Sequence, residues 1–122
     1  MKVLKFGGTS VADSQSLSHV VEIIKNSKKD QQIVVVSALG GITNILVEMA
    51  EKASKGKTEF QDTIKVIEKR HLTLILHFIP LTNQSEIISF LKSQLNSLEE
   101  ILESIYNLRE LTPYSLAKIS SF

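Results

Sequence analysis

The 122-residue sequence contains no cysteine, no tryptophan and only two prolines, and its opposite charges almost balance. Without cysteine the chain can form neither a disulfide framework nor a thiolate metal site, which is typical of a reducing compartment. The formal net charge is +1 and both signs are interspersed, so the sequence offers no basic stripe for nucleic acid. The longest apolar cluster, LTLILHFIPL, is far shorter than the ~20 residues of a membrane-spanning helix. We therefore expect a cytoplasmic protein that binds neither nucleic acid nor a membrane.

The N-terminal third predicts a βαβ unit. An apolar run that ends at Gly7-Gly8 predicts a buried parallel strand over residues 2–6. From Asp13 onward, apolar residues with helical spacing predict an amphipathic helix that ends among Lys25, Lys28 and Lys29. The β-branched run QQIVVVS then predicts a second buried strand. Because parallel strands end at the same edge of a sheet, the loops GGTS and SALGGITN should lie together there.

The remainder, from about residue 42 to 122, is predicted to be helical. The first two stripes start at Ile42 and at Phe60 and end near Gly56 and Pro80. Asn83 with Glu86 three positions later resembles a capping box that opens a third helix, whose leucine stripe we expect in the core. Thr112 before Pro113 predicts the N-cap of the last helix. The fold class is thus α/β, a βαβ start followed by about four helices.

Two strands are few for so many helices. A sheet of two parallel strands cannot cover its own faces, and the last predicted helix stops at KISSF without a residue that would end it. We therefore expect the chain to be a fragment of a longer one.

The stretch LKFGGTS has the chemistry of a phosphate-binding loop. Gly7 and Gly8 lack a Cβ, so their N–H groups can face an anion closely, and Thr9 and Ser10 add hydroxyl donors. Lys5 can place its ammonium group over the same pocket, and the N-terminus of the following helix is expected to point there too. The spacing differs from the Walker sequence, so a simple tight turn explains these two glycines about equally well.

The second loop, SALGGITN, follows the second strand with hydroxyl groups at Ser37 and Thr43. Taken alone, Thr43 or Asn44 could simply cap the helix that follows. Taken together, KFGGTSVAD and VVVSALGGITN resemble the two N-terminal signatures of the aspartokinases, which belong to the amino-acid kinase superfamily. The resemblance is close over residues 2–44 and looser beyond. A motif that starts so near Met1 is similar to the bifunctional aspartokinase/homoserine dehydrogenases.

The resemblance implies an α/β/α sandwich, of which residues 1–122 would be the N-terminal portion of the catalytic domain. It also implies transfer of the γ-phosphoryl group of ATP, with Mg²⁺, to the β-carboxylate of L-aspartate. This reaction is the first step toward lysine, threonine and methionine. Lys5 would be the catalytic charge, Gly7, Gly8, Thr9 and Ser10 would bind the ATP phosphates, and Ser37 and Thr43 would bind aspartate. A glutamate expected just beyond Phe122 would complete the aspartate site, so the isolated chain should be inactive, whereas the whole enzyme is expected to be a homo-oligomer.

Two other functions stay open on the sequence. Another amino-acid kinase, acting on glutamate or N-acetylglutamate, would share much of this pattern. A non-enzymatic helical interaction module would account for the many amphipathic helices. His71 and His77 lie too far apart around a helix to share a metal ion, and His19 is remote in sequence, so we expect no metal site formed by protein side chains.

Overall fold

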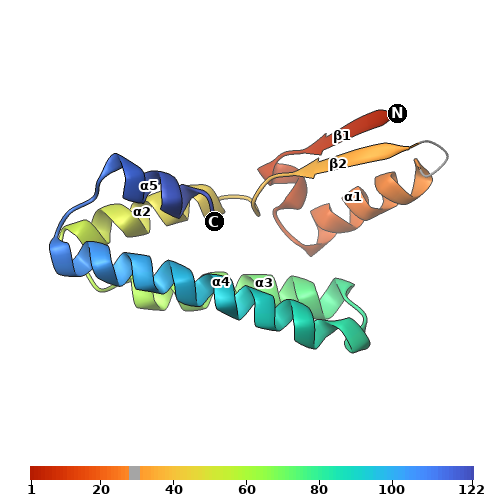
Figure 1. Cartoon of the computed structure of the whole chain (residues 1–122). Helices are drawn as coiled ribbons and strands as arrows, with labels where there is room; N and C mark the ends of the chain where they lie inside the picture. The colour runs from red at the N-terminus through yellow and green to blue at the C-terminus, as the bar shows by residue number, and fades with distance from the viewer. Residues whose placement is uncertain (28–30) are drawn as a thin grey trace. The chain divides into compact units, whose positions relative to one another are not determined.

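The computed structural model describes residues 1–27 and 31–122 of the chain. They form two compact units, Met1–Ile42 and Thr43–Phe122, which Figure 1 shows with the βαβ elements in one and the long helices in the other. The second unit coincides with the helical part that the sequence predicts from about residue 42. The observed class is α/β, as predicted, with a parallel two-strand sheet and five α-helices among the described residues.

The first unit is the predicted βαβ arrangement. Strand β1 (Lys2–Phe6) pairs in parallel with β2 (Gln32–Val36), in a register that places Lys5 opposite Val35. Helix α1 (Ser14–Asn26) runs alongside the two strands in Figure 1, and the Gln32 side-chain amide donates to the Ile24 carbonyl, which ties it to β2. Of the lysines predicted to end this helix, Lys25 lies in its last turn, and Lys28 and Lys29 lie outside the described residues.

The strands are less buried than their apolar sequences predict. Val3 is 64% exposed and Val36 is 58% exposed, and the neighbouring side chains of β2 are exposed as well. The prediction of two buried strands is therefore wrong for the described residues. The physical reason is that two strands and one helix leave much of the sheet uncovered, whereas a parallel sheet is normally covered on both faces.

The second unit consists of four helices around one apolar core. They are α2 (Ile42–Ser54), α3 (Phe60–Phe78), α4 (Leu81–Leu108) and α5 (Pro113–Ser120). Helices α3 and α4 pack side by side as an antiparallel hairpin (Figure 1). The predicted leucine stripe of α4 is buried, with Leu98 and Leu102 at most 2% exposed, and Ile119 of α5 is fully buried. This packing confirms that the stripe is core.

The helix ends agree with the predictions except at α4. Asp13 caps α1, Thr112 caps α5 through a 3.1 Å bond from the Ser115 N–H, and Gly56 follows α2 with a φ of +83°. The predicted capping box is wrong, because α4 begins at Leu81 and Asn83 lies inside its first turn. Pro80 lies between the two helices: a proline cannot continue α3, and its fixed φ is compatible with the start of α4. Within the described residues, no helix has the length and apolar character to cross a membrane.

Candidate functional site

The two glycine loops meet at the carboxyl ends of β1 and β2. The Ser37 N–H donates to the Phe6 carbonyl at 3.0 Å, which extends the strand pairing into the start of both loops. Beyond it the backbones come into contact: a Cβ placed on Gly8 would lie 3.5 Å from the Gly40 Cα. The structure thus confirms, for the part of the second loop that belongs to the first unit, that the two loops share one edge of the sheet.

Gly7 occupies a position that the chain itself leaves open. Its φ is −77°, which any residue can adopt, and a Cβ placed there would meet no atom within 4 Å. Neither backbone conformation nor packing therefore requires glycine at this position. The space beside Gly7 is open surface, so a group from outside the chain can approach the backbone closely there.

A short 3₁₀ helix, η1 (Gly8–Val11), follows Gly7, a feature that the sequence interpretation missed. The Ser10 N–H donates to the Gly7 carbonyl at 3.0 Å, and this bond bends the GGTS loop into a compact turn. The N–H groups that open such a turn have no partner within it and point outward. Thr9 is exposed and Ser10 half-buried, so the Thr9 hydroxyl is accessible in this loop.

Lys5 lies one residue before the end of β1 and is exposed. Side chains alternate along a strand, so Lys5 shares a face with Val3, whereas Leu4 and Phe6 share the other. Phe6 lines a cavity together with Val20 and Ile23 of α1, which places α1 on the Phe6 face. Lys5 therefore projects from the opposite face of the sheet, and among the described residues it forms no ion pair.

The N-terminus of α1 contributes less to an anion site than the sequence suggests. The Asp13 carboxylate accepts a 2.8 Å hydrogen bond from the Ser16 N–H. One of the backbone N–H groups at this helix end therefore already donates to a carboxylate of the chain itself and is not available to a ligand. The donors for a phosphate would come from the GGTS loop instead.

A cavity of about 270 Å³ lies beside the GGTS loop, between it and α1. Its polar lining comes from Thr9, Ser10, Ser16 and His19, and its apolar lining from Phe6 and two residues of α1. The cavity thus has three hydroxyl groups and one imidazole on a lining that is otherwise mostly apolar. It adjoins the proposed phosphate loop and contains two of the residues predicted from the sequence.

Thr43 is the second residue of α2 and belongs to the second unit, so it is described apart from the loops of the first. The helix begins at Ile42, whose N–H donates to the Leu39 carbonyl at 3.0 Å. Thr43 and Asn44 therefore lie inside the first turn, and neither is the N-cap. Both side chains are exposed, which leaves the Thr43 hydroxyl accessible.

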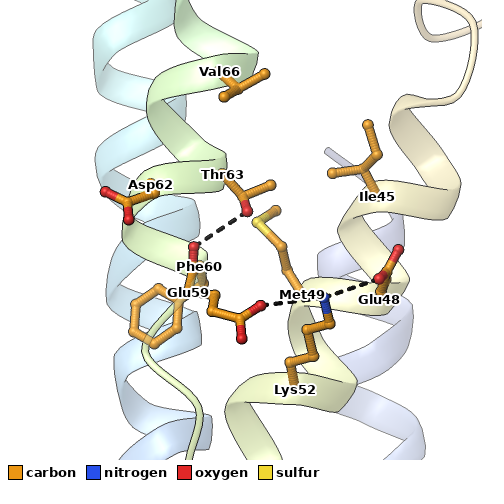
Figure 2. Close-up of a pocket in the computed structure, with 9 residues that line it drawn as sticks. All are labelled: Ile45, Glu48, Met49, Lys52, Glu59, Phe60, Asp62, Thr63 and Val66. Carbon is orange, nitrogen blue, oxygen red and sulfur yellow. Dashed lines mark hydrogen bonds and ion pairs between the residues drawn. The ribbon is translucent and has the colours of Figure 1, made fainter.

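A second cavity, of about 300 Å³, lies between α2 and α3, far along the sequence from the glycine loops (Figure 2). Lys52 reaches from α2 to Glu48 at 3.0 Å and to Glu59 at 3.2 Å. The hydrogen bond to Glu48 and, to a smaller extent, the hydrogen bond to Glu59 raise the pKa of Lys52. These groups satisfy one another, so we interpret the cluster as a link between α2 and the start of α3.

The histidines have roles in local contacts. The His71 Nδ1–H donates to the Ile67 carbonyl within α3 at 2.8 Å, and the His77 ring packs edge-on against Phe78. In the part of the chain that the structure describes, no three histidine or acidic side chains gather as a metal ion would require. Any Mg²⁺ that accompanies a nucleotide here would be held mainly by phosphate oxygens, as is usual for this ion.

The sequence of this chain is similar to those of curated aspartokinases. A bifunctional aspartokinase/homoserine dehydrogenase of Buchnera aphidicola is 35% identical over 90% of this chain, and aspartokinase 1 of Arabidopsis thaliana is 32% identical over 90%. The chain spans 14% and 19% of these relatives.

Among solved structures, Escherichia coli aspartokinase III in complex with aspartate and ADP superimposes with a TM-score of 0.82 at 25% identity. That match covers 99% of this chain and 25% of the other. Residues 1–110 match the amino acid kinase family. The chain therefore belongs to the amino acid kinase family.

Proposed function

We propose that this chain is the N-terminal part of an aspartate kinase that transfers the γ-phosphoryl group of ATP to the β-carboxylate of L-aspartate. Two kinds of relative support the choice of substrate. The curated relatives named above are aspartokinases, and the solved structure holds aspartate and ADP.

One observation carries the proposal: two glycine loops meet at the carboxyl edge of a parallel sheet, and one of them leaves open space at Gly7. Ligands of α/β proteins bind at the carboxyl ends of parallel strands. The packing of the chain does not require glycine at position 7. Close approach of a bound group to the backbone would explain why a residue without a side chain stands there. An ATP phosphate fits that space and the donors of the GGTS loop.

Each loop residue then has a defined task. Gly7 and Gly8 present N–H groups to the phosphates of ATP, and Thr9 and Ser10 add hydroxyl donors. Lys5 neutralises charge that develops on the transferring phosphoryl group. Ser37 and Thr43 hold aspartate, which completes the set of residues assigned to the reaction.

The reaction is a direct displacement. An oxygen of the aspartate β-carboxylate attacks the γ-phosphorus of ATP, and the bond to the β,γ-bridging oxygen breaks to give 4-phospho-L-aspartate and ADP. When bound, Mg²⁺ supplies positive charge to the phosphate oxygens. The residues of this chain supply positioning and charge stabilisation, which are the main demands of phosphoryl transfer.

The proposal extends to the pathway, compartment and assembly of the whole enzyme. The reaction would supply the pathway to lysine, threonine and methionine, in the cytoplasm, within a homo-oligomeric enzyme. The Buchnera relative favours a bifunctional enzyme with a homoserine dehydrogenase over an aspartokinase alone. The 122 residues alone are expected to be inactive, because they span only 14% of that relative. ADP release by the isolated chain above that of its Lys5→Ala variant would contradict this expectation.

Acceptor choice tests the proposal. The polypeptide encoded by the complete open reading frame around this chain would be incubated with ATP, Mg²⁺ and hydroxylamine, which traps acyl phosphates as hydroxamates. Aspartate should give a hydroxamate, whereas glutamate and N-acetylglutamate should not. Hydroxamate from glutamate or N-acetylglutamate would make the protein a different amino-acid kinase. No ATP consumption with any acceptor would favour a non-enzymatic module.

A further inference from the structure

Gly40 occupies the tightest place between the two loops. A Cβ on this residue would lie 2.8 Å from the Gly8 carbonyl oxygen and 3.0 Å from the Ala12 Cβ. Carbon atoms in good contact lie at roughly 3.5 Å or more, so even a methyl group does not fit here. The requirement for glycine is steric, because the Gly40 backbone is not among the positive-φ residues of the chain.

The neighbours of Gly40 cannot easily give way. The Gly8 carbonyl belongs to the backbone of the proposed phosphate loop, and Ala12, whose Cα would lie 3.3 Å from the added Cβ, follows η1 directly. Neither can rotate away as the end of a flexible side chain would. A methyl group at position 40 must therefore push the two loops apart by a few tenths of an ångström.

We propose that Gly40 is a positioning residue, which sets the distance between the phosphate loop at Gly7–Ser10 and the loop that begins at Ser37. This inference rests on the proposed function, in which one loop binds ATP and the other aspartate. In-line transfer depends on the separation of the attacking oxygen and the phosphorus, and a misplacement of about 1 Å can cost 100-fold in rate. Gly40 acts through the backbone of Gly8 and need not touch either substrate.

The neighbouring glycine provides a matched control. A Cβ on Gly41 would meet no atom within 4 Å, but its φ of +84° makes alanine strained there. Gly41→Ala therefore destabilises the same loop without filling the space between the loops. A comparison of Gly40→Ala with Gly41→Ala separates loop spacing from loss of stability.

The test uses the product of the complete open reading frame and measures kcat, the melting temperature, and the separate Kd values for ADP and aspartate. Gly40→Ala should lower kcat by on the order of tenfold or more, because the transition state needs both loops in register. Each Kd should change less than about threefold, because each substrate still meets an intact loop. Gly41→Ala should lower the melting temperature, and its kcat should fall much less than that of Gly40→Ala.

The measurements distinguish failure of the positioning role from failure of the proposed function. A Gly40→Ala enzyme with kcat within about threefold of an active wild type would refute the positioning role alone. The same refutation follows if kcat falls equally in Gly40→Ala and Gly41→Ala in step with the melting temperature, which would show a merely structural residue. A wild-type protein that forms no ADP with aspartate would instead refute the proposed function and, with it, the positioning role.

Discussion

Lys5 is the residue on which the proposed chemistry depends most. It is exposed near the end of β1, on the face of the strand away from α1, and the described residues offer it no carboxylate. Its charge is therefore available to a ligand. In the product of the complete open reading frame, Lys5→Ala should lower kcat on the order of 100-fold, because a charge on the transferring group acts chiefly in the transition state.

The matched control for this change is Lys25→Ala, which removes an exposed lysine from the last turn of α1 in the same unit. Steady-state kinetics and thermal melting of both variants provide the comparison. The fold should persist in each, because neither side chain is buried. A Lys5→Ala enzyme that keeps kcat within about threefold while losing stability would show that the residue is structural.

Thr43 tests the aspartate half of the proposal. Because α2 begins at Ile42, removal of the Thr43 hydroxyl takes no N-cap from the helix. Thr43→Val should raise the KM for aspartate at least several-fold with little effect on the KM for ATP, since one lost hydrogen bond costs roughly 0.5–1.5 kcal/mol. Thr43→Ser keeps the hydroxyl and should stay near wild type.

Equal increases in both KM values for Thr43→Val would argue against an aspartate site at this residue. A lower melting temperature with an unchanged aspartate KM would do the same. The assay is initial-rate kinetics with each substrate varied at saturating levels of the other, alongside a melting curve for each variant.

Residue types indicated the candidate site, whereas its contacts depend on tertiary structure. The βαβ pattern is enough to predict that the two loops meet, and their glycines and hydroxyls indicate what they could bind. The sequence could not distinguish the roles of the four loop glycines. Gly7 faces open space and Gly40 faces the Gly8 carbonyl, and this difference follows from how the loops pack. The assigned roles of the site residues in binding and catalysis stay predictions.

At the scale of elements, strong apolar periodicity predicted nearly every helix and strand. The bounds of β1 and α3 match the prediction, because Gly7 and Pro80 punctuate the sequence clearly. The start of α4 differs from the prediction because Asn83 and Glu86 imitate a capping box, whereas the helix already begins at Leu81, directly after Pro80. The turn η1 was missed, since a single 3₁₀ turn has no periodic apolar pattern.

The starts of α4 and α5 both carry cap-like residues, and a pair of substitutions tests which of them stabilises its helix. Thr112 accepts a hydrogen bond from the Ser115 N–H at 3.1 Å, whereas Asn83 lies within α4 and caps nothing. Thr112→Ala should lower the unfolding free energy by ~1 kcal/mol, the usual value of a threonine cap. Asn83→Ala, the control, should change it by less than about 0.5 kcal/mol, as is usual for exposed positions.

Urea denaturation of the two variants measures this difference. Losses of equal size would mean that the Thr112 hydrogen bond does not stabilise α5. A larger loss of unfolding free energy for Asn83→Ala would instead support Asn83 as the N-cap, against the start of α4 at Leu81.

At the scale of the whole molecule, the chain consists of two units with different degrees of burial. The helical unit has a continuous core that includes Leu98, Leu102 and Ile119. The βαβ unit carries the proposed loops on a sheet whose valines are partly exposed. Strand sequences alone predicted burial, because apolar runs indicate what a strand can bury and not how much of its surface is covered by neighbours.

The central claim is that the GGTS loop binds the phosphates of ATP, and Gly7 tests it most directly. The chain has room for a methyl group at this position and a φ that alanine adopts, so Gly7→Ala should fold normally. The same methyl group would occupy space assigned to the nucleotide. The measurement is the Kd of ATP, by calorimetry on the product of the complete open reading frame, together with its melting temperature.

We expect Gly7→Ala to weaken ATP binding on the order of tenfold while the melting temperature stays the same or rises slightly, since alanine restricts the unfolded chain more than glycine. The Kd of aspartate should be nearly unchanged. A Gly7→Ala protein that binds ATP as tightly as wild type would contradict the account, because the open space beside Gly7 would then hold no phosphate.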